Sequence, residues 1–385
     1  MKRRIALAFI LAAGLSGCST IGGWFGMSGS DTPKIKPAPL TQFKETVGLI
    51  RMWDVNVGKS APYVFSPAGD GQAIYAAGKD GRIVKIDPAT GHELWRIEAG
   101  QTLSSGVGVG DGLILVGTPR GEMLAYHSDS GKLAWSAKLS GEILVPPVAA
   151  NGMVAVRSND GNVWLFNAAD GKQRWEYTRT LPPLILRVPG NLLLTDRALF
   201  VGYPGGTMVA LALNNGAPLW ETSVAVPKGA TDLERISDVT GPLAADDHVV
   251  CAAAYQGRIG CFDQANGNPV WVRTFSGLSG VELGDHYIFA TDEHAMVQGF
   301  DTTGGASPWK QETLRDRLLT TPTVVSSYIA VADYQGYVHL ISQDDGSLVG
   351  RAATDNSAVS GRILGLKSGL IVQTDKGGVY AFRIK

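Results

Sequence analysis

The chain of 385 residues is poor in the features on which most enzymes and nucleic-acid-binding proteins depend. Charged residues make up only 18% of it, the formal net charge is −1, and no block of Lys or Arg follows the first four residues. This balance argues against a nucleic-acid-binding surface. Motifs of serine hydrolases, zinc proteases and P-loop proteins are absent. The Gly-rich run at 106–112 resembles a dinucleotide-binding loop, but no helix is expected after it, so it lacks the context that such a loop needs.

Long helical patterns and metal-ligand spacings are missing as well. After the N-terminus, no segment of about a dozen residues places its apolar residues at the helical period. The 49 glycines instead separate short β-branched and aromatic runs, which is typical of an all-β protein. The six histidines fall at non-equivalent turns and strand ends, so we expect no metal site and no cofactor.

The N-terminal residues have the composition of a secretory signal. Three basic residues at 2–4 precede the apolar run Ile5–Leu15, which is too short to span a bilayer. The run ends in "LSGC", which resembles a bacterial lipobox. We therefore predict a lipoprotein signal peptide over residues 1–17 and lipidation of Cys18. An ordinary secretory signal with an incidental cysteine is the alternative.

Residues 18–45 lack hydrophobic periodicity and are rich in Gly and Ser, then in Pro. This composition predicts a flexible tether that carries the lipid. Ser19 follows the predicted lipidation site, where an aspartate would resemble an inner-membrane retention signal. We therefore predict a protein anchored to the outer membrane on its periplasmic face.

A hairpin recurs along the rest of the chain. In "DGRIVKIDPATGHELW" (Asp80–Trp95), a glycine precedes a short strand, a polar turn follows, and a second strand leads to tryptophan. Similar units return at intervals of 38–51 residues, which is the period of one four-stranded propeller blade. Each unit also holds an inner strand, often introduced by Pro, and strands joined by Asn/Asp-Gly turns.

The two ends of the repeat array complement each other. The last copy, "KGGVYAFRIK", stops at Lys385 before its turn and outer strand. The missing strand is present in "LIRMWDVNVG" (Leu49–Gly58), whose tryptophan lies 42 residues before the next one. We therefore predict an all-β fold over 46–385: an eight-bladed β-propeller of four-stranded antiparallel blades, with the ring closed by the N-terminal strand completing the last blade.

Tryptophan ends the hairpin in seven of the eight blades, and Gly350 takes its place in the other. A ligand platform would need one or two tryptophans in different surroundings. Seven equivalent ones indicate a structural wedge that docks one blade on the next. They are Trp53, Trp95, Trp135, Trp175, Trp220, Trp271 and Trp309.

Two stretches interrupt the period, Thr178–Gly190 and Ala225–Gly241. Loops on a rigid scaffold commonly carry function, so these insertions are the candidate partner-binding segments. The first contains "LPPLILRVP", which is apolar between prolines. We favour an exposed patch for a partner over the alternative, a plug folded over the central channel.

The repeat, with its terminal tryptophan, resembles the quinoprotein-type (PQQ-like) β-propeller repeat. Together with the lipobox and the stretches "LILR" (Leu184–Arg187), "DLERISDV" (Asp232–Val239) and "RDRLLTTPTV" (Arg315–Val324), the chain resembles the BamB family, lipoproteins of the outer-membrane β-barrel assembly (BAM) machinery. The resemblance implies a non-enzymatic scaffold that binds the POTRA domains of BamA. It also implies a role in the assembly and insertion of outer-membrane β-barrel proteins, with nascent chains as further partners.

In that family, a Leu-x-Leu-Arg loop and acidic residues of the next insertion contact BamA. The resemblance carries this role to Leu184, Leu186, Arg187 and Asp238, whereas the family's second aspartate is Thr240 here. Two alternatives remain, a periplasmic PQQ-dependent enzyme and a propeller that binds a small ligand or glycan. Quinoprotein dehydrogenases share the repeat, but the resemblance there is to longer chains with a vicinal Cys-Cys pair and a calcium cluster, and this sequence has neither. A glycan-binding propeller would need a polar, aromatic-rimmed channel mouth, whereas the insertion here is apolar.

Cys251 and Cys261 lie on the two strands of one hairpin, opposite each other or one residue out of register. The periplasm is oxidising, so a cross-strand disulfide is possible. Adjacent antiparallel partners are often poorly oriented for one. We therefore expect two buried free thiols.

Overall fold

The computed structural model describes residues 36–187, 190 and 192–385. By its internal contacts the chain divides into two units, Met1–Lys36 and Pro37–Lys385, and the second is the propeller described below. The predicted signal peptide, Cys18 and most of the predicted tether lie outside the described residues. No helix in the described ranges is long and apolar enough to cross a membrane.

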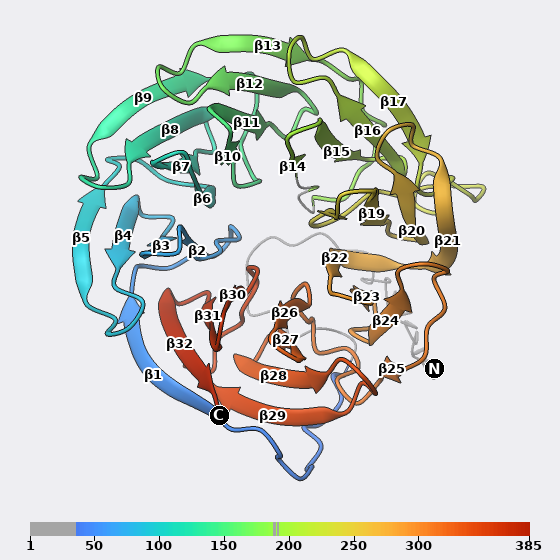
Figure 1. The fold of residues 1–385 in the computed structure, drawn as a ribbon. Helices are drawn as coiled ribbons and strands as arrows, with labels where there is room; N and C mark the ends of the chain where they lie inside the picture. The colour runs from blue at the N-terminus through green and yellow to red at the C-terminus, as the bar shows by residue number, and fades with distance from the viewer. Residues whose placement is uncertain (1–35, 188–189, 191) are drawn as a thin grey trace, which may run out of the picture. The chain divides into compact units, whose positions relative to one another are not determined.

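Short strands with β-branched and aromatic residues, separated by Gly-containing turns, form eight four-stranded antiparallel sheets, which confirms the predicted fold class (Figure 1). Each sheet is one blade, and in every blade except the last the strand that comes first in the chain is nearest the central axis. From inner to outer strand, blades 1 to 4 are β2 (Ala68–Gly69), β3 (Ile74–Ala77), β4 (Arg82–Ile86), β5 (Glu93–Glu98); β6 (Ser105–Gly110), β7 (Leu113–Gly117), β8 (Glu122–His127), β9 (Leu133–Lys138); β10 (Val148–Ala150), β11 (Met153–Arg157), β12 (Val163–Asn167), β13 (Gln173–Tyr177); and β14 (Leu192–Leu194), β15 (Leu199–Tyr203), β16 (Thr207–Leu211), β17 (Pro218–Ser223).

The ring closes as the sequence predicts, because the N-terminal strand is the outer strand of blade 8. It pairs with the C-terminal strand from Leu49↔Ile384 to Asn56↔Gly378. From inner to outer strand, blades 5 to 8 are β18 (Ala244–Ala245), β19 (Val249–Ala253), β20 (Gly257–Asp263), β21 (Pro269–Phe275); β22 (Gly277–Leu283), β23 (Tyr287–Asp292), β24 (Val297–Asp301), β25 (Lys310–Gln311); β26 (Thr323–Val325), β27 (Tyr328–Ala332), β28 (Tyr337–Ser342), β29 (Leu348–Ala353); and β30 (Leu364–Leu366), β31 (Gly369–Gln373), β32 (Gly378–Ile384), β1 (Leu49–Asn56).

The core lies between the blades. The middle strands are buried on both faces, as in β7 and β11, where every residue is buried. One apolar cluster joins Leu115 and Met123 of blade 2 to Val154 and Trp164 of blade 3. Apolar residues therefore occur on both faces of a strand, which explains why the strict alternation of a one-sided sheet is weak in this sequence.

Each of the seven repeat tryptophans docks on the next blade around the ring. Its indole Nε1–H donates to a backbone carbonyl in the turn between the two outer strands of that blade, at 2.8–3.3 Å. In blade 4, Trp220 donates to Gln264 and its ring lies over Gly267. Gly267 has φ of +73°, and a Cβ there would come within 2.7 Å of the ring. Both the backbone conformation and the lack of space therefore require glycine at this position.

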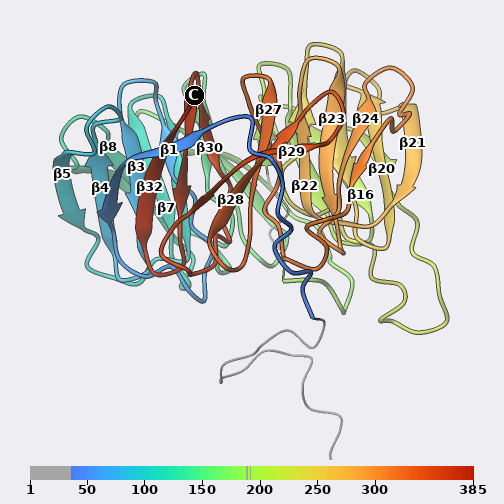
Figure 2. The ribbon, with the colours of Figure 1, turned by 90° about the horizontal axis from the view of Figure 1, so that it is seen from below.

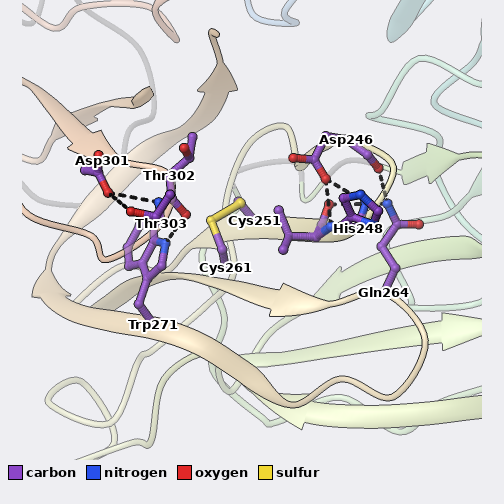
Figure 3. The surroundings of a disulfide bond; sticks show 10 residues. Asp246, His248, Cys251, Cys261, Gln264, Trp271, Asp301, Thr302 and Thr303 are labelled. Atoms are coloured by element: carbon purple, nitrogen blue, oxygen red, sulfur yellow. Dashed lines mark hydrogen bonds between the residues drawn. A yellow bond between two sulfur atoms is a disulfide. The ribbon is translucent and has the colours of Figure 1, made fainter. Parts of the chain in front are cut away.

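Cys251 and Cys261 form a disulfide, so the expectation of free thiols is wrong (Figure 3). The two residues are directly opposite on β19 and β20, and their Cα atoms are only 4.1 Å apart. This separation is that of the closely spaced type of antiparallel pair, in which the two side chains come near each other. The sequence left the register open by one residue, and the register decided the outcome.

The compact unit begins at Pro37, whereas the repeat pattern predicts that the propeller starts at residue 46. The Ala38 N–H donates to the Arg315 carbonyl at 3.0 Å, and the Thr46 N–H donates to the Val349 carbonyl at 2.9 Å. A Pro-rich segment without periodicity can still bind a fixed surface through its backbone, and composition alone does not show this.

Candidate functional site

The two insertions open on the same face of the ring. Strands alternate in direction, so every connection from an outer strand to the next inner strand emerges on one face, here called the insertion face. The loop between β17 and β18 projects furthest from it, at the lower edge of the side view (Figure 2). The start of the described chain, drawn in blue, reaches the same edge.

The first insertion leaves β13 and is held at its base by an ion pair. The Arg179 guanidinium donates from both terminal nitrogens to the Glu221 carboxylate of blade 4, at 2.8 Å each. Further along, Leu184 and Leu186 are half-buried, while Arg187 is exposed and pairs with Glu142 of the β9–β10 connection at 3.1 Å. The "LILR" stretch thus presents one arginine and a partly exposed apolar edge.

The described part of this insertion does not line the central cavity. The cavity at the ring centre, of about 740 Å³, is lined by inner strands and their approaches, and no residue from Leu181 to Arg187 contributes to its wall. The partner-patch interpretation therefore stays a prediction, taken up below.

The second insertion has a small internal framework of its own. The Glu234 carboxylate accepts from the N–H groups of Ala230 and Thr231 at 2.8 and 3.0 Å, as in a capping box. The same hydrogen bonds hold the pKa of Glu234 below its usual range. Val226 and Leu233 of this insertion are 49% and 51% exposed.

Asp238 is placed differently from the expectation of a partner contact. Its side chain is buried, with the residue only 4% exposed. One carboxylate oxygen accepts from the Leu186 N–H at 2.7 Å, and the other accepts from the Gly205 N–H at 3.0 Å. Burial raises the pKa of Asp238, while these two hydrogen bonds work in the opposite direction. Asp238 therefore ties the first insertion to the base of the second.

Arg157 supports the same region and is not among the residues that the sequence predicts for the site. It is 7% exposed and donates from Nη1 to the Gly202 carbonyl at 2.6 Å and the Gly190 carbonyl at 3.2 Å. Its guanidinium lies 4.7 Å from the centre of the Tyr203 ring. A signal existed, because counting back from the repeat glycine places the charged Arg157 where blades 1, 2 and 4 have the small residues Ala77, Gly117 and Gly202.

Thr240, where the family carries a second acid, is fully buried. Its hydroxyl donates to the Gly277 carbonyl at 2.9 Å and its N–H donates to the Ala253 carbonyl at 3.2 Å. A carboxylate at this position would face a carbonyl oxygen without a proton to donate. The departure from the family pattern therefore fits the surroundings of Thr240.

The central cavity does not suit a quinone cofactor with several carboxylates. Its charged lining residues are Glu282 and Arg362, and they pair with each other. Burial raises the pKa of Glu282, and the guanidinium opposes that shift. One arginine already paired cannot balance a polyanion, and the remaining wall is mostly aliphatic. Within the described ranges, no three His, Cys, Asp or Glu side chains gather in a way that could hold a metal ion.

Comparison with known proteins places these features in a family. The model of "Outer membrane protein assembly factor BamB" matches residues 79–311. A protein of that name from Burkholderia pseudomallei is 40% identical over 348 residues, covering 90% of this chain and 91% of the relative. These relatives are named as assembly factors and not as enzymes.

Solved structures agree on the fold. BamB from Moraxella catarrhalis has a TM-score of 0.80 at 24% identity, covering 87% of this chain and 99% of that one. A quinohemoprotein alcohol dehydrogenase from Pseudomonas putida has a TM-score of 0.70 at 12% identity, covering 87% of this chain and 76% of that one, so the two share a fold alone. From the family model and the relatives of similar length, the chain belongs to the BamB family of outer membrane protein assembly factors.

Proposed function

We propose that this chain is a scaffold lipoprotein, anchored through Cys18 to the periplasmic face of the outer membrane, that binds the POTRA domains of BamA. In this proposal the contact is made by Leu184, Leu186 and Arg187 of the first insertion. The scaffold holds BamA while outer-membrane β-barrel proteins are assembled and inserted, and nascent chains are candidate further partners.

One observation carries the proposal: the buried Asp238 carboxylate joins the two insertions into one ordered surface. A loop that is already ordered loses less conformational entropy when a partner binds. Arg187 lies at the exposed edge of that surface, and arginine is enriched among the residues that dominate binding energies. Asp238 acts from beneath as a positioning residue.

The test is a pull-down from detergent-solubilised outer membranes. The double variant Leu184→Asp, Arg187→Glu is expected to lose at least about tenfold of the co-purified BamA, because one buried charge at an interface costs more than 1.4 kcal/mol. A matched control, Lys132→Glu with Leu133→Asp, makes the same kind of change at exposed positions on the opposite face. Unchanged BamA recovery with the insertion variant would refute the proposed contact.

Asp238→Ala separates positioning from direct contact. We expect weaker BamA recovery together with faster hydrogen exchange at the Leu186 amide, whose acceptor is removed. Loss of BamA with unchanged exchange at Leu186 would instead mean that Asp238 touches the partner.

A further inference from the structure

Residues 37–46, here called the strap, run along the outside of blade 7 beside β29 (Figure 2). The strap begins at the insertion face, where Ala38 bonds to Arg315. It ends near the opposite face, where Gly48 and Lys385 exchange backbone hydrogen bonds of 3.1 and 2.9 Å. Ala38, Leu40 and Phe43 are half-buried, whereas the polar residues between them are exposed.

Two arginines of blade 7 and its approach hold the strap. Arg317 is 2% exposed, donates from Nη1 to the Ala38 carbonyl at 2.9 Å, and pairs with Asp333 at 2.7 Å. Arg351 donates from Nη1 to the Thr41 carbonyl at 3.1 Å. The Arg351 guanidinium lies 4.8 Å from the centre of the Phe43 ring, within the range of a cation–π contact.

His339 links the two arginines and is completely buried. The Arg351 Nε–H donates to His339 Nδ1 at 3.1 Å. Because arginine has no acceptor, Nδ1 is unprotonated, and the proton on Nε2 is donated to Asp333 at 3.1 Å. The arrangement therefore requires a neutral histidine.

Protonation of His339 would put an N–H against the N–H of Arg351. The groups that face the ring are Asp333, Arg317, Arg351 and, on its own strand, Tyr337. Burial lowers the pKa of His339, the Asp333 contact raises it, and the two arginines lower it further. A protonated ring would be a third cation beside a single buried carboxylate. Of the two arginines, Arg351 is half-buried whereas Arg317 is only 2% exposed, so Arg351 is the one that can move away.

We propose that the strap is a releasable part of the N-terminal linker, latched to blade 7 by Arg351 while His339 is neutral and freed when His339 is protonated. Strand β1 stays in place, since its own pairing with β32 does not involve His339. Release of about ten residues adds up to roughly 33 Å to the linker that joins the propeller to the rest of its N-terminus. The device is independent of the contact proposed for the first insertion.

The experiment places 4-fluorophenylalanine at position 43 of the full chain and follows its ¹⁹F resonance from pH 8 to pH 5. We expect the resonance of the docked ring to be lost in acid, with a midpoint below that of free histidine, while near-ultraviolet circular dichroism shows that the propeller remains folded. A docked resonance that persists to pH 5 in the folded protein overturns the proposal.

Variants assign the response. His339→Gln removes the titrating ring, so its ¹⁹F spectrum is expected not to change with pH, whereas His286→Gln at an exposed position should titrate like the wild type. Arg351→Met should show the released resonance already at pH 7.5. Titration that survives in His339→Gln, or a docked ring in Arg351→Met, would contradict the latch.

Discussion

Seven junctions between neighbouring blades are built alike, and the eighth is not. At the seven, a tryptophan of one blade lies on the outer turn of the next and bonds to its backbone. Between blades 7 and 8, Gly350 stands at the tryptophan position. The Val47 N–H instead donates to the Val349 carbonyl at 3.0 Å, and Val47 is 8% exposed within the apolar cluster of these two blades.

The difference follows from how the ring closes, since the two outer strands of blade 8 come from opposite ends of the propeller. Blade 8 has no turn between its two outer strands, because β32 ends near Lys385 and β1 starts at Leu49. A tryptophan at 350 would have no turn on which to dock. A Cβ at Gly350 would also come within 2.7 Å of the Val47 carbonyl. At the junction where the ring closes, the backbone segment at Val47 thus takes the place of the tryptophan side chain found at the other seven junctions.

The largest effect is expected from removing β1 together with the segment before it. A chain that starts at Val57 leaves β32 as an open edge and uncovers the apolar groups that Trp53 buries, so we expect aggregation in place of cooperative unfolding. Size-exclusion chromatography and circular dichroism would show this. A circular permutant that appends residues 48–56 after Lys385 through a two-residue Asn-Gly turn should restore a folded monomer, because Lys385 and Gly48 lie opposite each other and need a turn to be joined. Failure to do so would mean that the two ends of the propeller do more than close the ring.

An intermediate effect is expected at an ordinary junction. Trp220→Ala removes a wedge that is 9% exposed and packs against Phe200, so it should lower the free energy of unfolding by about 3–5 kcal/mol. Chemical denaturation of the variant and the wild type measures it. A loss below about 1 kcal/mol would show that the tryptophans fill space without supporting the stacking of blades.

The smallest effect distinguishes the eighth junction from the others. Gly350→Trp restores the residue of the repeat, yet we expect it to destabilise the protein by about 1–3 kcal/mol, because the space is already occupied by Val47. Denaturation again gives the value, with Gly350→Ala as the smaller step. An increase in the free energy of unfolding for the tryptophan variant would contradict the conclusion that the Val47 segment fills the place of the tryptophan.

Periodicity made the propeller predictable, since the glycine, turn and tryptophan positions are each repeated and errors in one copy are corrected by the others. The candidate site was harder to predict from the sequence. Leu184 and Arg187 stand out because they break the repeat, but the burial of Asp238 and the support from Arg157 depend on contacts between segments 33 to 52 residues apart. The disulfide depended on a register that the sequence left open by one residue.

By itself, the sequence determined the strands, the number of blades and the closure of the ring, because these follow from local propensity and a regular period. Only the tertiary structure decided that Asp238 lies beneath the insertions and that a Pro-rich segment is bound to blade 7 by buried arginines. Local patterns specify which face of a strand is buried, whereas the partner of an irregular segment is set by the surface that the finished ring presents to it.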